Sequence, residues 1–196
     1  MTPEKFNKSG LANFFIPLSQ SQVTLRQAYD ALLMVGNPSS DVPLIVRLTE
    51  NPEFDFGGFG FFKGRVSLRQ HDFAHIVLGR GLALTDEAFV IGFTMGSSNR
   101  VTTQEKKLFA FIARSLYPKP YRFSENGIQV FKDAVHLGYV SDCIPLEDVD
   151  FEPMLDMTLA EIRETIRLEE DLLQAYYRIE AKRYPASEPS QRLIKH

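Results

Sequence analysis

Four short segments of this sequence have the pattern of a capping box, in which Ser or Thr is followed three residues later by Glu or Gln. They begin at Thr24, Ser67, Thr102 and Thr158. Apolar residues recur after each at the spacing of one face of an α-helix. We therefore predict an all-α fold, a single-domain helical bundle of about six to eight helices.

Glycine and proline signals separate the predicted helices. These helices cover about residues 25–35, 68–78, 85–97, 103–117, 125–140 and 159–184. The last is long and amphipathic, and Glu180 falls near its apolar face together with Leu173 and Tyr177. We assign residues 1–184 to one helical domain. The polar, proline-bearing segment 185–196 is expected to be a disordered tail, because few apolar residues can anchor it.

The composition excludes some classes of function. The chain has 196 residues, 44% of them hydrophobic, and a net charge of -3, so it lacks the basic field that nucleic-acid binding requires. Its one cysteine, Cys143, cannot form an internal disulfide. We find no secretory signal or transit peptide and no apolar run of the roughly 18 residues that span a bilayer. We expect a cytoplasmic protein, with any lipid contact peripheral to the membrane.

The segment from His71 to Glu87 contains side chains that bind metals, within an otherwise apolar stretch. His71 and His75 lie about 40° apart on one helix face, with Cβ atoms roughly 5 to 6 Å apart. Both can therefore contact one ion. Asp72 is rotated by about 100° from His71, so it is either a further ligand or a support for one.

Glu87 needs a turn of the chain to reach the histidines. On an unbroken helix it would lie about 18 Å beyond His75. Gly79 and Gly81 end the helix between them, and an αα-hairpin closing over residues 79–84 would bring Glu87 back beside the histidine pair.

Both helices of this hairpin are apolar nearly all round, so we expect them in the core. Ionisable groups there need one another, water or a metal. A divalent cation would satisfy them together, although a hydrogen-bonded core cluster without metal is an alternative that spacing leaves open. The predicted ligands are His71, Asp72, His75 and Glu87.

The pattern His71-Asp72-Phe-Ala-His75, eleven residues and then Glu87 resembles the metal-binding signature of the coenzyme Q biosynthesis protein 4 family, which acts in ubiquinone synthesis. Residues 149–166 are similar to the closing segment of that family, although Met157-Thr158 stands where the family tends to have proline. The resemblance covers about residues 20–168, and the helix after 168 is longer than expected.

This resemblance implies a metal-dependent homodimer, peripheral to the inner face of the membrane. It implies a prenylated quinone precursor or another isoprenoid lipid as ligand, and other ubiquinone-biosynthesis proteins as partners. The protein would act at C1 of the head group by oxidative decarboxylation, or organise the biosynthetic complex. The divalent metal would be zinc, iron, manganese, cobalt or magnesium, and two histidines with a carboxylate would leave coordination positions open.

A polyprenyl tail would need an apolar path, and phenylalanines are dense in residues 54–62. We predict a lid or membrane-touching loop here, with a loop packed over the bundle as the alternative. The candidate lipid contacts are Phe59, Phe61, Phe62, Phe89 and Phe93.

Other functions remain open from the sequence. A zincin-like metallohydrolase uses His-x-x-x-His and a downstream glutamate, but Asp72 is one methylene shorter than the general-base glutamate of those enzymes. A non-catalytic prenyl-lipid-binding scaffold needs no reaction at all. A phosphohydrolase of the His-Asp type would need a histidine before His71, and the sequence has none. His136 and His196 are expected to be structural or incidental, and Cys143 is expected to be a buried or loop thiol rather than a nucleophile.

Overall fold

The computed structural model describes residues 14–35, 68–98 and 123–195. Within them the helices are α2 (Leu25–Val35), α4 (Leu68–Val77), α5 (Leu84–Ser97), α7 (Glu125–Val140), η2 (Leu146–Asp148), η3 (Glu152–Met154), α8 (Leu159–Thr165), α9 (Glu170–Arg183) and α10 (Glu188–Arg192). These ranges hold no strand, only an isolated bridge between Thr24 and Thr158. The predicted all-α bundle is confirmed. The predicted helix 103–117 and the phenylalanine-rich loop lie outside the described residues.

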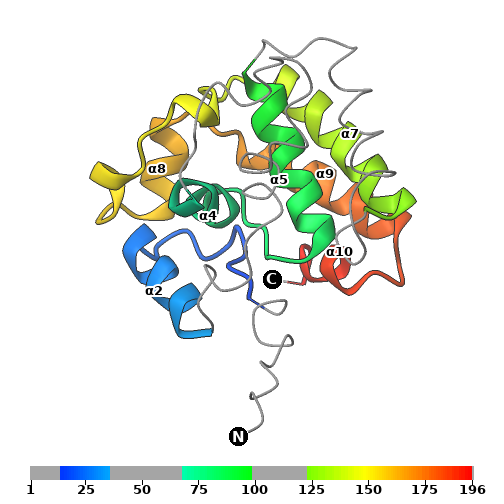
Figure 1. Cartoon of the computed structure of the whole chain (residues 1–196), viewed down its shortest axis with the longest axis horizontal. Helices are drawn as coiled ribbons and strands as arrows, with labels where there is room; N and C mark the ends of the chain where they lie inside the picture. The colour runs from blue at the N-terminus through cyan, green and yellow to red at the C-terminus, as the bar shows by residue number, and fades with distance from the viewer. Residues whose placement is uncertain (1–13, 36–67, 99–122, 196) are drawn as a thin grey trace, which may run out of the picture.

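Helices α4 and α5 occupy the centre of the described structure (Figure 1). On one side α4 contacts α2 and α8, and on the other side α5 contacts α7 and α10. The central pair is therefore covered by helices from both ends of the sequence, which is why it is buried. None of the helices within these ranges has the length and apolar character needed to cross a membrane.

The crossing of α5 and α7 is very close. A Cβ atom at Gly92 would lie 2.5 Å from the carbonyl oxygen of Phe131, and one at Gly138 would lie 2.4 Å from that of Phe93. Only glycine lets the two backbones approach this far. The glycines therefore let α5 pack directly against the backbone of α7.

Three predicted helix starts are confirmed by their capping hydrogen bonds. The hydroxyl of Thr158 accepts from the Glu161 amide (3.2 Å), and the Glu161 carboxylate accepts from the Thr158 amide (2.7 Å). Thr24 and Gln27 make the same reciprocal pair at α2. Ser124 caps α7 by accepting from the third helical amide.

The predicted single helix 159–184 is wrong, because the chain divides it into α8 and α9. Arg167 has φ 56°, and the amides of Arg167 and Leu168 donate to the carbonyls of Glu164 and Arg163. This is a Schellman motif, which usually places glycine at the left-handed position. Because arginine occupies it here, no residue typical of a helix end marks this break.

The expected disordered tail also needs correction, since residues 188–192 form α10. Ser187 caps this helix by accepting from the amide of Ser190. Ser190 is fully buried, and its hydroxyl donates to Glu180. Polar contacts with buried charged residues hold this segment in place. Its low apolar content therefore did not lead to disorder.

Candidate metal centre

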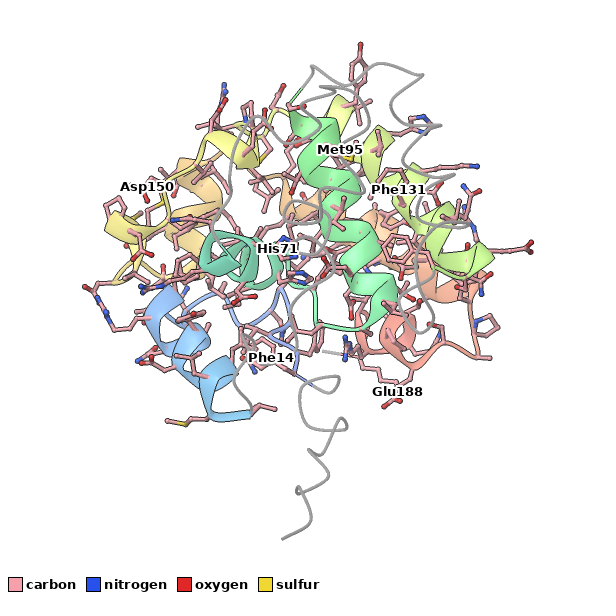
Figure 2. All side chains as sticks on the ribbon, viewed as in Figure 1. Phe14, His71, Met95, Phe131, Asp150 and Glu188 are labelled. Atoms are coloured by element: carbon pink, nitrogen blue, oxygen red, sulfur yellow. The ribbon has the colours of Figure 1, made fainter. Side chains whose placement is uncertain are left out.

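His71 lies near the middle of the described structure (Figure 2). It converges there with His75, also on α4, and with Glu87 on α5. His71 Nε2 lies 3.0 Å from Glu87 Oε1, and His75 Nε2 lies 3.0 Å from Glu87 Oε2. The two Nε2 atoms are also 3.0 Å apart. The hairpin prediction is confirmed: α5 returns beside α4 and presents Glu87 to both imidazoles.

Gly79 makes this return possible. It has φ 64°, and a Schellman motif ends α4 there: the amides of Gly79 and Arg80 donate to the carbonyls of Ile76 and His75. A side chain at residue 79 would be strained, and its Cβ would also lie 2.8 Å from a methyl carbon of Leu18. The glycine signal in the sequence therefore marks the turn.

A backbone carbonyl fixes the orientation of the His75 ring. Its Nδ1 donates a hydrogen bond of 2.7 Å to the carbonyl oxygen of Gly81, an atom that can only accept. The proton of a neutral imidazole therefore lies on Nδ1, and the lone pair lies on Nε2, facing His71 and Glu87. Histidines that bind metals are commonly held in this way.

The spacing of the three groups suits one cation. Two ligand atoms at about 2.1 Å from an ion are about 3.0 Å apart when they subtend a right angle, and about 3.4 Å apart at a tetrahedral angle. The two Nε2 atoms are 3.0 Å apart, and each is 3.0 Å from a different oxygen of the Glu87 carboxylate. The ligand atoms of His71, His75 and Glu87 all lie within 4.8 Å of one another, so one ion can contact all three side chains.

The electrostatics of the group fit a cation as well. Burial favours the neutral acid of Glu87, but the two imidazoles outweigh it and hold its pKa well below the usual value. Burial likewise disfavours a charged His75, but its hydrogen bond to Glu87 and the negative charge there raise its pKa. Glu87 thus stays ionised and attracts positive charge, which a proton or a metal ion can supply.

Asp72 is buried, 3% exposed, but it is not part of the converging group. Burial raises its pKa to about 6, although the charges of His75 and His71 act against that rise. Of the two roles considered for Asp72, electrostatic support fits this position better than direct ligation.

Phe89 and Phe93 belong to the core. Both are fully buried, and their rings stack with centroids 6.0 Å apart. Phe89 also packs on Tyr176 and on the edge of Tyr177. Protein side chains account for these contacts without a lipid. Phe59, Phe61 and Phe62 lie outside the described residues.

Sequence reasoning missed the charged residues behind the hairpin. Arg80 and Glu180 are fully buried and form a double hydrogen bond of 3.1 and 2.6 Å. Asp86 is also fully buried and pairs with Arg192. One signal was available: Glu180 falls on the apolar face of its helix, where an acid needs a buried partner.

Cys143 is buried as expected, and burial raises the pKa of its thiol to about 12, so it is not a reactive nucleophile.

No family model, curated protein or solved structure matches this chain. The geometry of the site and the sequence motif therefore carry the functional argument.

Proposed function

We propose that this protein binds one divalent cation through His71, His75 and Glu87. The observation that carries the proposal is the convergence of three buried side chains: the two Nε2 atoms are 3.0 Å apart, and each lies 3.0 Å from one oxygen of the Glu87 carboxylate. Buried ionisable groups of this kind need a partner, and a cation satisfies all three.

A set of two histidines and one carboxylate accepts zinc, iron, manganese or cobalt. Two histidines and one carboxylate on one face are the ligands of non-haem iron oxygenases. An ion held there would supply positive charge to polarise an oxygen-bearing group of a substrate. The chain's own contribution is to hold the ligands and to fix the His75 tautomer.

Metal titration of the stripped protein tests this proposal. Isothermal titration should show one site per chain for Co(II) and Mn(II), and the visible spectrum of Co(II) should change when it binds. His75→Ala and Glu87→Gln should abolish binding. His136→Ala is the matched control, because His136 is exposed on α7. Folded wild-type protein that binds no divalent ion would refute the proposal.

We propose further that the metal centre serves ubiquinone synthesis, acting on a prenylated quinone precursor at the inner face of the membrane. This step is supported by the signature from His71 to Glu87 and by the open positions that such a ligand set leaves. The reaction would be oxidative decarboxylation at C1 of the head group, carried out beside other proteins of the pathway by a homodimer.

Complementation separates the enzyme from a scaffold. A host lacking its own protein of this family should regain ubiquinone with the wild-type chain, and with Glu87→Gln should accumulate a precursor that keeps its C1 carboxyl. Recovery of ubiquinone with the folded, metal-free variant would favour the non-catalytic lipid-binding scaffold.

A liposome-binding experiment tests the separate prediction, made from the sequence, that the phenylalanine-rich segment 54–62 contacts lipid. It compares the wild-type chain with a variant in which Phe59, Phe61 and Phe62 are replaced by serine, on liposomes that contain prenylated quinone.

A further inference from the structure

The hairpin between α4 and α5 is held by the C-terminal part of the chain. The carbonyl of Val77 accepts from Arg163 Nε (2.9 Å) on α8. The carbonyl of Leu78 accepts from the hydroxyl of Tyr177 (2.5 Å) on α9. Two carbonyls that the end of α4 leaves without helical partners are thus satisfied by residues about a hundred positions later.

Arg80 at the tip of the hairpin is enclosed in the same way. Its guanidinium lies over the rings of both Phe89 and Tyr177, 3.8 and 4.3 Å from their centroids, and forms the double hydrogen bond with Glu180. The hydroxyl of Ser190 on α10 donates to the same carboxylate at 2.9 Å. Helix α10 is therefore tied to the hairpin through buried charges.

Arg192 on α10 contacts residues next to the proposed metal ligands. It pairs with Asp86, whose carboxylate also accepts from the Ala83 amide (3.1 Å) and so fixes the start of α5 immediately before Glu87. The guanidinium also lies against Gly81, where a Cβ atom would collide with it and with the carbonyl oxygen of Phe14. The carbonyl of Gly81 is the group that orients His75.

We propose that Arg192 is a positioning residue for the metal centre. It fixes the Gly81 carbonyl and the first turn of α5, so that His75 Nε2 and the Glu87 carboxylate face one point. This inference rests on the proposed metal site. The C-terminal segment beyond residue 168 then has a role in metal binding. Its helices α9 and α10 pack over the hairpin and set the affinity of the site for the cation.

Loss of Arg192 has a defined consequence in this arrangement. Asp86 also lies 3.7 Å from Arg80, so without Arg192 its carboxylate can turn toward Arg80 and release the Ala83 amide. Groups behind metal-binding histidines and carboxylates typically change metal affinity by about 10- to 100-fold when removed. We expect a loss in this range.

The test compares Arg192→Met, Arg192→Lys and a control, Arg183→Met, in the full chain. Arg183 makes an ion pair with Asp133 on α7, so its variant reports the loss of an ordinary arginine pair on α9. Isothermal titration with Co(II) should give about 10-fold weaker binding or worse for Arg192→Met, partial recovery for Arg192→Lys and a change within about twofold for Arg183→Met. Equal affinity of folded Arg192→Met and wild type would overturn the proposal.

A second measurement needs no metal. The Nδ1 proton of His75, held by the Gly81 carbonyl, should give a downfield resonance in the metal-free protein, and this resonance should shift or broaden in Arg192→Met but not in Arg183→Met. If Arg192→Met does not fold, Arg192→Lys carries both measurements, and an unchanged affinity with an unchanged resonance would overturn the proposal. A wild type that binds no Co(II) refutes the metal site itself, whereas normal wild-type binding with an unaffected Arg192 variant refutes only the positioning role.

Discussion

Asp72 shows how burial acts on a single charged side chain in this fold. Burial raises its pKa from 3.8 to about 6, and the nearby histidines reduce that rise without cancelling it. An acid whose pKa is higher in the folded than in the unfolded state is favoured in its protonated form, so its ionisation lowers the free energy of unfolding. The resulting decrease in the free energy of unfolding is absent below about pH 3.8 and reaches its full size above about pH 6.

We therefore predict that Asp72→Asn stabilises the metal-free protein at neutral pH. The free energy of unfolding at pH 8 should rise by on the order of 2 kcal/mol, and the gain should vanish as the pH falls toward 4. Urea unfolding in the presence of a chelator, repeated across this pH range, measures it.

Asp156→Asn is the control for Asp72. Hydrogen bonding to Arg26 lowers the pKa of this exposed carboxyl, so the sign reverses: its ionised form stabilises the fold above its ordinary pKa, and the contribution is lost as the pH falls. The variant should lose a little stability at pH 8. A gain for Asp72→Asn that does not change with pH would show that charge is not its cause.

At the scale of elements, the α5 and α7 crossing depends on glycine. A Cβ atom at Gly96 would fall on the carbonyl oxygen of Val135 and would lie 3.0 Å from the Tyr139 amide nitrogen. Both are backbone atoms that cannot move aside without separating the helices. We predict that Gly96→Ala lowers the free energy of unfolding by about 1 to 3 kcal/mol, the usual cost of overpacking.

Gly127→Ala in the first turn of α7 is the matched control for Gly96→Ala. A Cβ atom there would have its nearest neighbour at 3.4 Å, which is ordinary contact, and alanine is the better helix former by up to about 1 kcal/mol. Denaturant unfolding of both variants should give opposite signs. Equal effects would mean that the close approach of α5 and α7 does not limit stability.

Elements whose ends are marked by short-range signals could be predicted from the sequence. The capping boxes at Thr24 and Thr158 and the glycine at the end of α4 each act within a few residues, so the sequence contains the whole signal. The break after α8 could not be predicted, because Arg167 adopts a conformation that sequence statistics assign to glycine. Helix α10 was missed because its partners lie elsewhere in the chain.

The same distinction applies to the whole molecule. The three proposed ligands fall within 17 consecutive residues, from 71 to 87, and one hairpin brings them together, so their geometry follows from local rules. The partners Arg80 and Glu180 are 100 positions apart, and no periodicity connects them. Only the folded structure shows that the C-terminal helices enclose the hairpin.

Because the proposed ligands lie on the two central helices, metal binding should stabilise the whole fold and not only the hairpin. A ligand that binds the native state alone adds about 4 kcal/mol at a thousandfold excess over its Kd. We predict that Tm rises steadily with the logarithm of the Co(II) or Mn(II) concentration in wild-type protein, with a single transition. Calorimetry measures this rise; Glu87→Gln should remove it and His136→Ala should keep it. A rise of equal size in Glu87→Gln would place the stabilising ion elsewhere.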